Sequence, residues 1–158
     1  MDLSATWVAL RKLVGVWVGT GVGEFPTLDS FTYRERFDIA ERRAQVLHYL
    51  QETWRDVDSE EVGSHIETGF ITLADDGAVE VLNAQGSDRV EVLSGHAELS
   101  GSVVSIDLES VALVHDERMI SSWWKLHIDG DELRYTMGMA TKSVSGGATH
   151  LTARLTRQ

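Results

Sequence analysis

The sequence feature that most constrains the fold is a glycine-rich stretch near the start of the chain, residues 15–27. Glycine stands at four of the nine positions from Gly15 to Gly23, and the only proline of the sequence, Pro26, follows shortly after. Each glycine costs a helix interior about 1 kcal/mol, so a helix is disfavoured here. Glycine within a strand permits a bend or a close backbone approach, whereas proline cannot donate to a sheet ladder. The stretch is therefore typical of the first strand of a small closed barrel.

Segments with the period of a β-strand make up most of the remaining chain. Phe31, Tyr33, Glu35, Phe37 and Ile39 alternate with more polar residues, which predicts a strand with two different faces. Further strands are predicted at residues 46–54, 66–73, 78–82, 89–93, 103–108, 119–128, 132–139 and 150–155.

Turn residues separate these predicted strands. Asp76-Gly77 indicates a two-residue hairpin, and Ser145-Gly146-Gly147 indicates a flexible turn before the last strand. Only residues 4–14, with apolar side chains three and four positions apart, favour a helix.

Together these elements predict an all-β fold: an antiparallel up-and-down β-barrel of about ten strands with one short N-terminal helix. We expect residues 1–158 to form a single domain. An open sheet of this size would leave two long edges exposed, which favours closure into a barrel. A barrel of about ten strands is wide enough to hold a ligand.

Composition narrows the classes of partner. The chain has 14 basic and 25 acidic residues and a formal charge of -11, so we expect no binding to nucleic acid or to anionic membranes. It has no cysteine, which excludes disulfides and thiolate metal sites. No signal peptide and no apolar run long enough for a membrane span are visible, so we expect a cytoplasmic protein.

Histidines are the only side chains that indicate chemistry, and their spacing fits no zinc motif. A single histidine is more often a structural or surface residue than a ligand. His150 opens the last predicted strand, in which Leu151, Ala153 and Leu155 share the apolar face. Strict alternation would point His150 outward, whereas a polar-lined cavity or a β-bulge would turn it inward. The sequence leaves both arrangements open.

Several motifs, in order along the chain, resemble those of one family. Gly15-x-Trp17-x-Gly19-x-Gly21 precedes Gly23-Glu-Phe-Pro-Thr27, and the segment from His65 to Phe70 reads His-x-Glu-x-Gly-Phe. Residues 82–86, 90–95, 137–140 and 150–155 add weaker matches. The chain resembles the nitrobindins, haem-binding β-barrels related in architecture to fatty-acid-binding proteins.

The resemblance implies a site. It implies one haem b per chain, with His150 as the axial ligand of the iron and as the catalytic residue. Thr27 would lie beside the haem, and Met139 and His65 would lie in or near the pocket. Lys125 is a candidate partner for a haem propionate, as is Lys142.

The resemblance also implies an activity, namely binding of nitric oxide and isomerisation of peroxynitrite to nitrate by ferric haem. The alternative is a non-catalytic carrier of a fatty acid, haem or another apolar small molecule in the same barrel. Residues 141–149 depart from the shorter, proline-containing segment of the family. The oligomeric state is open, with a homodimer as one option.

Overall fold

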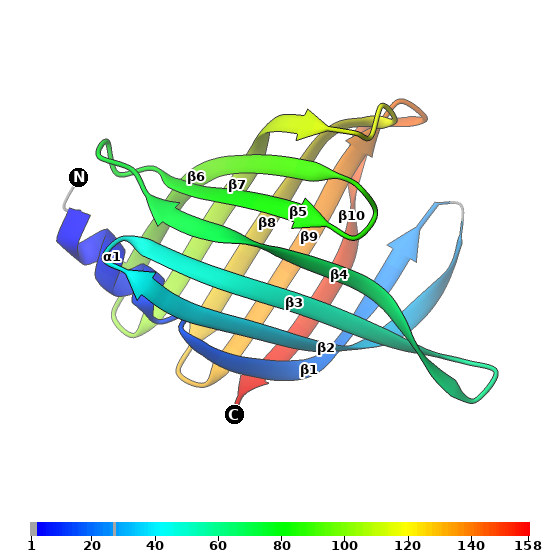
Figure 1. Cartoon of the computed structure of the whole chain (residues 1–158), viewed down its shortest axis with the longest axis horizontal. Helices are drawn as coiled ribbons and strands as arrows, with labels where there is room; N and C mark the ends of the chain where they lie inside the picture. Colours follow the sequence, from blue (N-terminus) through cyan, green and yellow to red (C-terminus); the bar gives the residue numbers. More distant parts are fainter. Residues whose placement is uncertain (1–2, 27) are drawn as a thin grey trace.

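A computed structural model describes residues 3–26 and 28–158 of the chain. In it one helix is followed by ten antiparallel strands that close into a barrel (Figure 1). The elements are α1 (Leu3–Arg11), β1 (Gly15–Phe25), β2 (Leu28–Arg43), β3 (Val46–Val57), β4 (Glu60–Leu73), β5 (Val79–Gln85), β6 (Val90–Ser100), β7 (Val103–Val114), β8 (Met119–Asp129), β9 (Glu132–Thr141) and β10 (Val144–Arg157).

The strands have up-and-down topology. Each strand pairs with the next along the chain, and β1 closes the barrel by pairing with β10 from Trp17↔Arg157 to Gly23↔Leu151. At Gly19 a side chain would overlap the carbonyl oxygen of Arg154 in β10, so glycine permits the close approach of these two strands. The predicted fold class is confirmed.

Three local predictions need correction. The helix ends at Arg11. Beyond it, backbone hydrogen bonds between residues three apart continue as far as Val14. Asp76-Gly77 does not form a two-residue hairpin; Ala74 and Ala78 bracket a three-residue loop in which Gly77 has φ 90°.

The third correction concerns Ser145-Gly146-Gly147, which lies inside β10 and not in a turn. The chain turns at Lys142-Ser143 instead. The glycine segment is accommodated as an irregularity, because Val144 pairs with Thr141 whereas the next paired residue of β10, Ala148, pairs with Met139.

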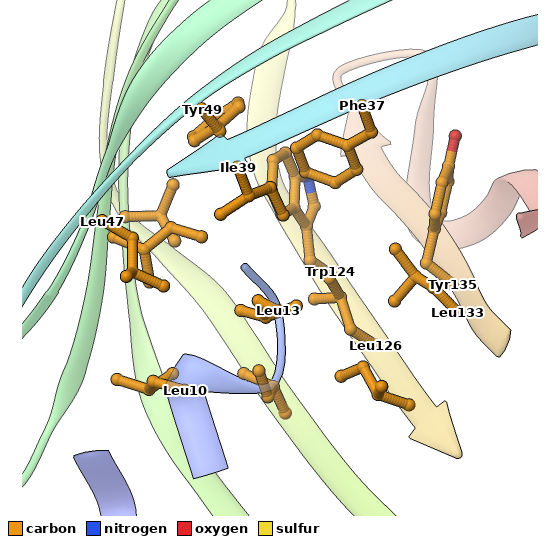
Figure 2. Close-up of a cluster of buried hydrophobic side chains, with 14 of the residues drawn as sticks. Leu10, Leu13, Phe37, Ile39, Leu47, Tyr49, Trp124, Leu126, Leu133 and Tyr135 are labelled. Carbon is orange, nitrogen blue, oxygen red and sulfur yellow. The ribbon is translucent and has the colours of Figure 1, made fainter. Parts of the chain in front are cut away.

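One end of the barrel is covered by α1, which contacts β6 and β4 (Figure 1). Leu10 and Leu13 point from this helix and its extension into a cluster with Ile39, Leu47 and Leu126 (Figure 2). Trp17 is buried beside this cluster and donates from Nε1 to the carbonyl of Leu13 at 2.7 Å. This end is an apolar core.

Within the described residues, no helix has the length and apolar character needed to cross a membrane.

Candidate functional site

His150 lies inside the barrel wall and is 4% exposed. Thr149 pairs with Gly138 and Leu151 pairs with Met137, so His150 is the extra residue of a bulge in β10. Because a bulge shifts the side-chain alternation by one residue, Leu151, Ala153 and His150 can all face inward. The sequence left open whether His150 points outward or inward. In the structure it points inward, because of the bulge.

Two contacts from the end of β1 hold the His150 ring. Its Nδ1 lies 2.9 Å from the backbone oxygen of Glu24. A carbonyl oxygen can only accept, so Nδ1 carries a proton, and Nε2 is the nitrogen that bears the lone pair in the neutral form of the ring. The ring of Phe25 stacks on the imidazole with centroids 4.8 Å apart and planes 3° apart. The structure therefore presents a buried imidazole whose orientation and tautomer are both fixed, and among the described residues no group bonds to its Nε2.

The other predicted site residues divide into two groups. Met139 pairs with Ser122 and Ala148, and the buried Ser122 shows that this row faces the interior at the end where His150 lies. His65 is one-third exposed and bonds from Nε2 to Glu67 Oε2 at 3.0 Å. Both line the interior away from α1.

The remaining predictions are not brought to His150. Lys125 lies on the outer face of β8, where its Nζ is 3.4 Å from Asp107 Oδ1 and its side chain is 64% exposed. Lys142 is an exposed turn residue. Thr27 lies outside the described residues.

Buried polar side chains occupy the interior between the apolar cluster and His150. Glu35 accepts from Tyr135 at 2.5 Å and from Gln51 Nε2 at 2.6 Å, and the hydroxyls of Tyr135 and Tyr33 are 2.9 Å apart. Burial raises the pKa of the Glu35 carboxyl from 4.5 to about 7. Burial likewise raises the pKa values of Tyr33 and Tyr135 above their usual value. At neutral pH Glu35 thus sits near its titration midpoint inside the barrel.

A second buried polar group lies on β3 to β6. Tyr49 donates to Glu67 Oε1 at 2.8 Å, and the other oxygen of Glu67 faces His65. Glu91 is buried opposite Asn83, and burial raises the pKa of its carboxyl. The Asn83 side chain lies among these groups and interacts with both Tyr49 and Glu91. This half of the barrel is polar within, unlike the half under α1.

The hollows of the surface do not coincide with His150. A hollow of about 840 Å³ lies on the outer face of β7 to β10 and β1, lined by residues such as Thr20, Lys125, Arg134 and Arg154. A smaller one of about 380 Å³ opens beside Thr53, Ser64 and His65. His150 defines the candidate site, because its contacts are specific whereas the larger hollow is an open groove outside the barrel.

Sequence reasoning missed two kinds of site residue. Glu24 and Phe25 contact His150, but they belong to the motif that was used only to identify the barrel. The buried glutamates did leave a signal: Glu35 shares its strand face with Tyr33 and Phe37, which is unusual for a carboxylate on a solvated surface.

The fold and site define a class of protein: a closed antiparallel barrel that presents a buried histidine from its last strand. The chain belongs to the THAP4-like, heme-binding beta-barrel domain family, the nitrobindins, whose family model matches residues 6–157. It is therefore a haem-binding barrel domain whose ligands are small molecules.

Named relatives agree with this assignment. The chain is 30% identical over 141 residues to a peroxynitrite isomerase of Mycobacterium leprae, covering 87% of this chain and 86% of the relative. It is 31% identical over 144 residues to peroxynitrite isomerase 1 of Mycobacterium tuberculosis H37Rv, covering 87% of each. The crystal structure of Rv2717c from M. tuberculosis is similar with a TM-score of 0.86 and 30% identity, covering 99% of both chains.

The residues present fit a haem. Haem iron in proteins is commonly held by a neutral imidazole whose second nitrogen donates to a carbonyl or carboxylate. His150 has the second feature, since its Nδ1 donates to the Glu24 carbonyl, and Nε2 is the ring atom left to bind a metal.

Proposed function

We propose that this chain holds one haem b with His150 Nε2 as its axial ligand, binds nitric oxide, and isomerises peroxynitrite to nitrate at ferric iron. The hydrogen bond from His150 Nδ1 to the Glu24 carbonyl carries the proposal, because it leaves one unprotonated nitrogen on a buried ring. Relatives named peroxynitrite isomerase at about 30% identity support the choice of reaction. Cytoplasmic location remains a prediction from the sequence.

The chain contributes orientation and an enclosed environment to this chemistry. Phe25 limits rotation of the imidazole by stacking on it, and the Glu24 carbonyl strengthens the ring as a donor. Met139 and His65 are proposed to line the pocket, with Thr27 beside it. The outward position of Lys125 gives it no support as a propionate partner.

The reaction needs no co-substrate. Peroxynitrite and nitrate contain the same atoms and carry the same charge, so neither an oxidant nor a reductant is consumed. When bound, the haem supplies the iron centre at which the O–O bond is rearranged, and the protein supplies the ligand and the pocket.

Haemin titration tests the ligand assignment. We expect wild-type protein to give a Soret band with one haemin per chain, and His150→Ala to bind haemin at least about 100-fold more weakly because the only strong ligand is lost. His127→Ala is the matched control, since His127 lies exposed on the outer face of β8. Equal haemin affinity of wild type and His150→Ala would show that the axial assignment is wrong.

Stopped-flow spectroscopy tests the reaction. Ferric holo-protein is expected to accelerate peroxynitrite decay with nitrate as the product, in proportion to haem content. Haem binding without acceleration would overturn the enzymatic part and leave the alternative of a non-catalytic carrier.

A further inference from the structure

We propose that Trp123 and Gly138, on the outer side of the barrel wall, are positioning residues for the imidazole of His150. The importance of this role for haem ligation rests on the proposed function. The packing itself is a property of the protein without haem, and it can be tested there.

The bulge that turns His150 inward lies directly beside these residues. Gly138 of β9 pairs with Thr149, the last residue before His150, and also with Trp123 of β8. The three strands β8, β9 and β10 therefore meet at the level of the bulge, with Gly138 in the middle.

Gly138 has no room for a side chain. A Cβ there would overlap the indole of Trp123 and would lie 2.6 Å from the carbonyl oxygen of Ala148. The half-buried indole of Trp123 consequently lies directly against the backbone of β9. A larger residue at position 138 would prevent this contact. A glycine at this point of a strand is explained by the aromatic ring that covers it.

The same indole also reaches the irregular part of β10. Gly147 has φ 69°, and a Cβ there would lie 3.0 and 3.1 Å from two atoms of the Trp123 ring. Trp123 thus covers glycines on two neighbouring strands and bridges β9 to the segment of β10 that leads into His150.

The bulge is held from both sides of the wall. On the inside, Glu24 and Phe25 contact the His150 ring. On the outside, Trp123 covers the backbone of the same region. A one-residue slip of β10 would restore strict alternation and move His150 to the outer face. We infer that Trp123 opposes this slip by packing against the irregular register.

Nuclear magnetic resonance of the apo-protein tests this directly. In wild type, the His150 ring nitrogens, assigned by comparison with His150→Gln, should report one tautomer with the proton on Nδ1. Trp123→Ala should give mixed tautomers and a solvent-exchanging Nδ1 proton, whereas Trp123→Phe, which keeps an aromatic ring, should retain the wild-type signals. If Trp123→Ala is destabilised but keeps the wild-type His150 signals, Trp123 is merely structural and the proposal is wrong.

A glycine pair supplies a matched second test. Gly138→Ala should disturb the His150 signals in the same way, because its Cβ displaces the indole or the Ala148 carbonyl. Gly146→Ala, in the neighbouring strand, meets no atom within 4 Å and should leave the signals unchanged. Equal, wild-type-like spectra for both variants would overturn the proposal, even if one of them lowers the melting temperature.

Haemin binding separates this proposal from the proposed function. Trp123→Ala should bind haemin at least about tenfold more weakly than wild type, and Trp123→Phe within about threefold. If wild-type protein binds no haemin, the proposed function fails, while the resonance data on the apo-protein still decide the role of Trp123. If wild type binds haemin and Trp123→Ala binds it equally well, the proposed function stands and the positioning role is wrong.

Discussion

The two ends of the barrel are built from the same strands but differ in what fills them. Under α1 the interior consists of apolar side chains such as Leu10, Leu47 and Leu126 (Figure 2). At the other end it contains Glu35, Glu67 and His150, all buried and, except for His150 Nε2, largely hydrogen-bonded.

Strand regularity differs in the same way. Of the seven register irregularities among the described residues, only that at Glu41/Arg43 lies at the helix end. The apolar end is regular because alternation alone buries its side chains. The polar end departs from alternation where particular side chains must be turned, as at His150. The apolar packing therefore lies at one end and the proposed haem site at the other, and substitutions can separate the two.

The largest effect should come from the apolar end. Leu10→Ala removes a fully buried side chain from the core and should lower the free energy of unfolding by about 2–5 kcal/mol. Chemical denaturation measures this loss, and the position of the Soret band in holo-protein should not change. Val8→Ala on the exposed side of the same helix is the control and should cost less than about 1 kcal/mol. A shifted Soret band in Leu10→Ala would show that the two ends are coupled.

At the polar end, the free energy of unfolding should depend on pH. Glu35 has a pKa of about 7 in the folded protein and 4.5 as its usual value, so between these values the folded state binds the extra proton. The stabilisation that this proton gives is fully present below pH 4.5 and is lost as the pH rises through 7. The loss in the free energy of unfolding is at most about 3 kcal/mol.

Glu35→Gln removes that titration. The variant should keep its hydrogen bonds, because Gln51 Oε1 has no partner and the Gln51 amide can turn to accept from the new amide. Between pH 4.5 and 8, the free energy of unfolding should fall more steeply with pH for wild type than for Glu35→Gln. The variant should be the more stable protein at pH 8. Parallel curves would show that Glu35 does not titrate in this range.

The two ends also differ in how far the sequence predicts them. Alternation and turn residues predicted all ten strands and the closed barrel, because register in a sheet with one buried face is set by its apolar pattern. The same rule fails at His150 and at Ser145-Gly146-Gly147, because an irregularity adds residues to one strand and the alternation of apolar residues does not reveal them. Trp123 over Gly138 was not predictable either, because the contact depends on the pairing of two strands.

The smallest effect is expected at Lys125, which lies outside both ends of the interior. Lys125→Ala removes an exposed ion pair with Asp107 and should change the free energy of unfolding by less than about 1 kcal/mol. Haemin affinity should stay within about twofold of wild type. A marked loss of affinity would mean that the haem edge reaches the outer wall, which would blur the division between the interior and the surface.

The pairing that closes the barrel has a consequence for synthesis. Trp17 faces Arg157 across the β1–β10 ladder, and the Arg157 guanidinium lies 4.1 Å from the centre of the Trp17 ring. Contacts of such long sequence separation slow folding, because the loop between the partners must be closed first. During translation, the edge of β1 that pairs with β10 therefore stays unpaired until β10 has left the ribosome. The strand that closes the barrel is also the one that carries His150, so a nascent chain contains this histidine only when the last strand of the wall is also present.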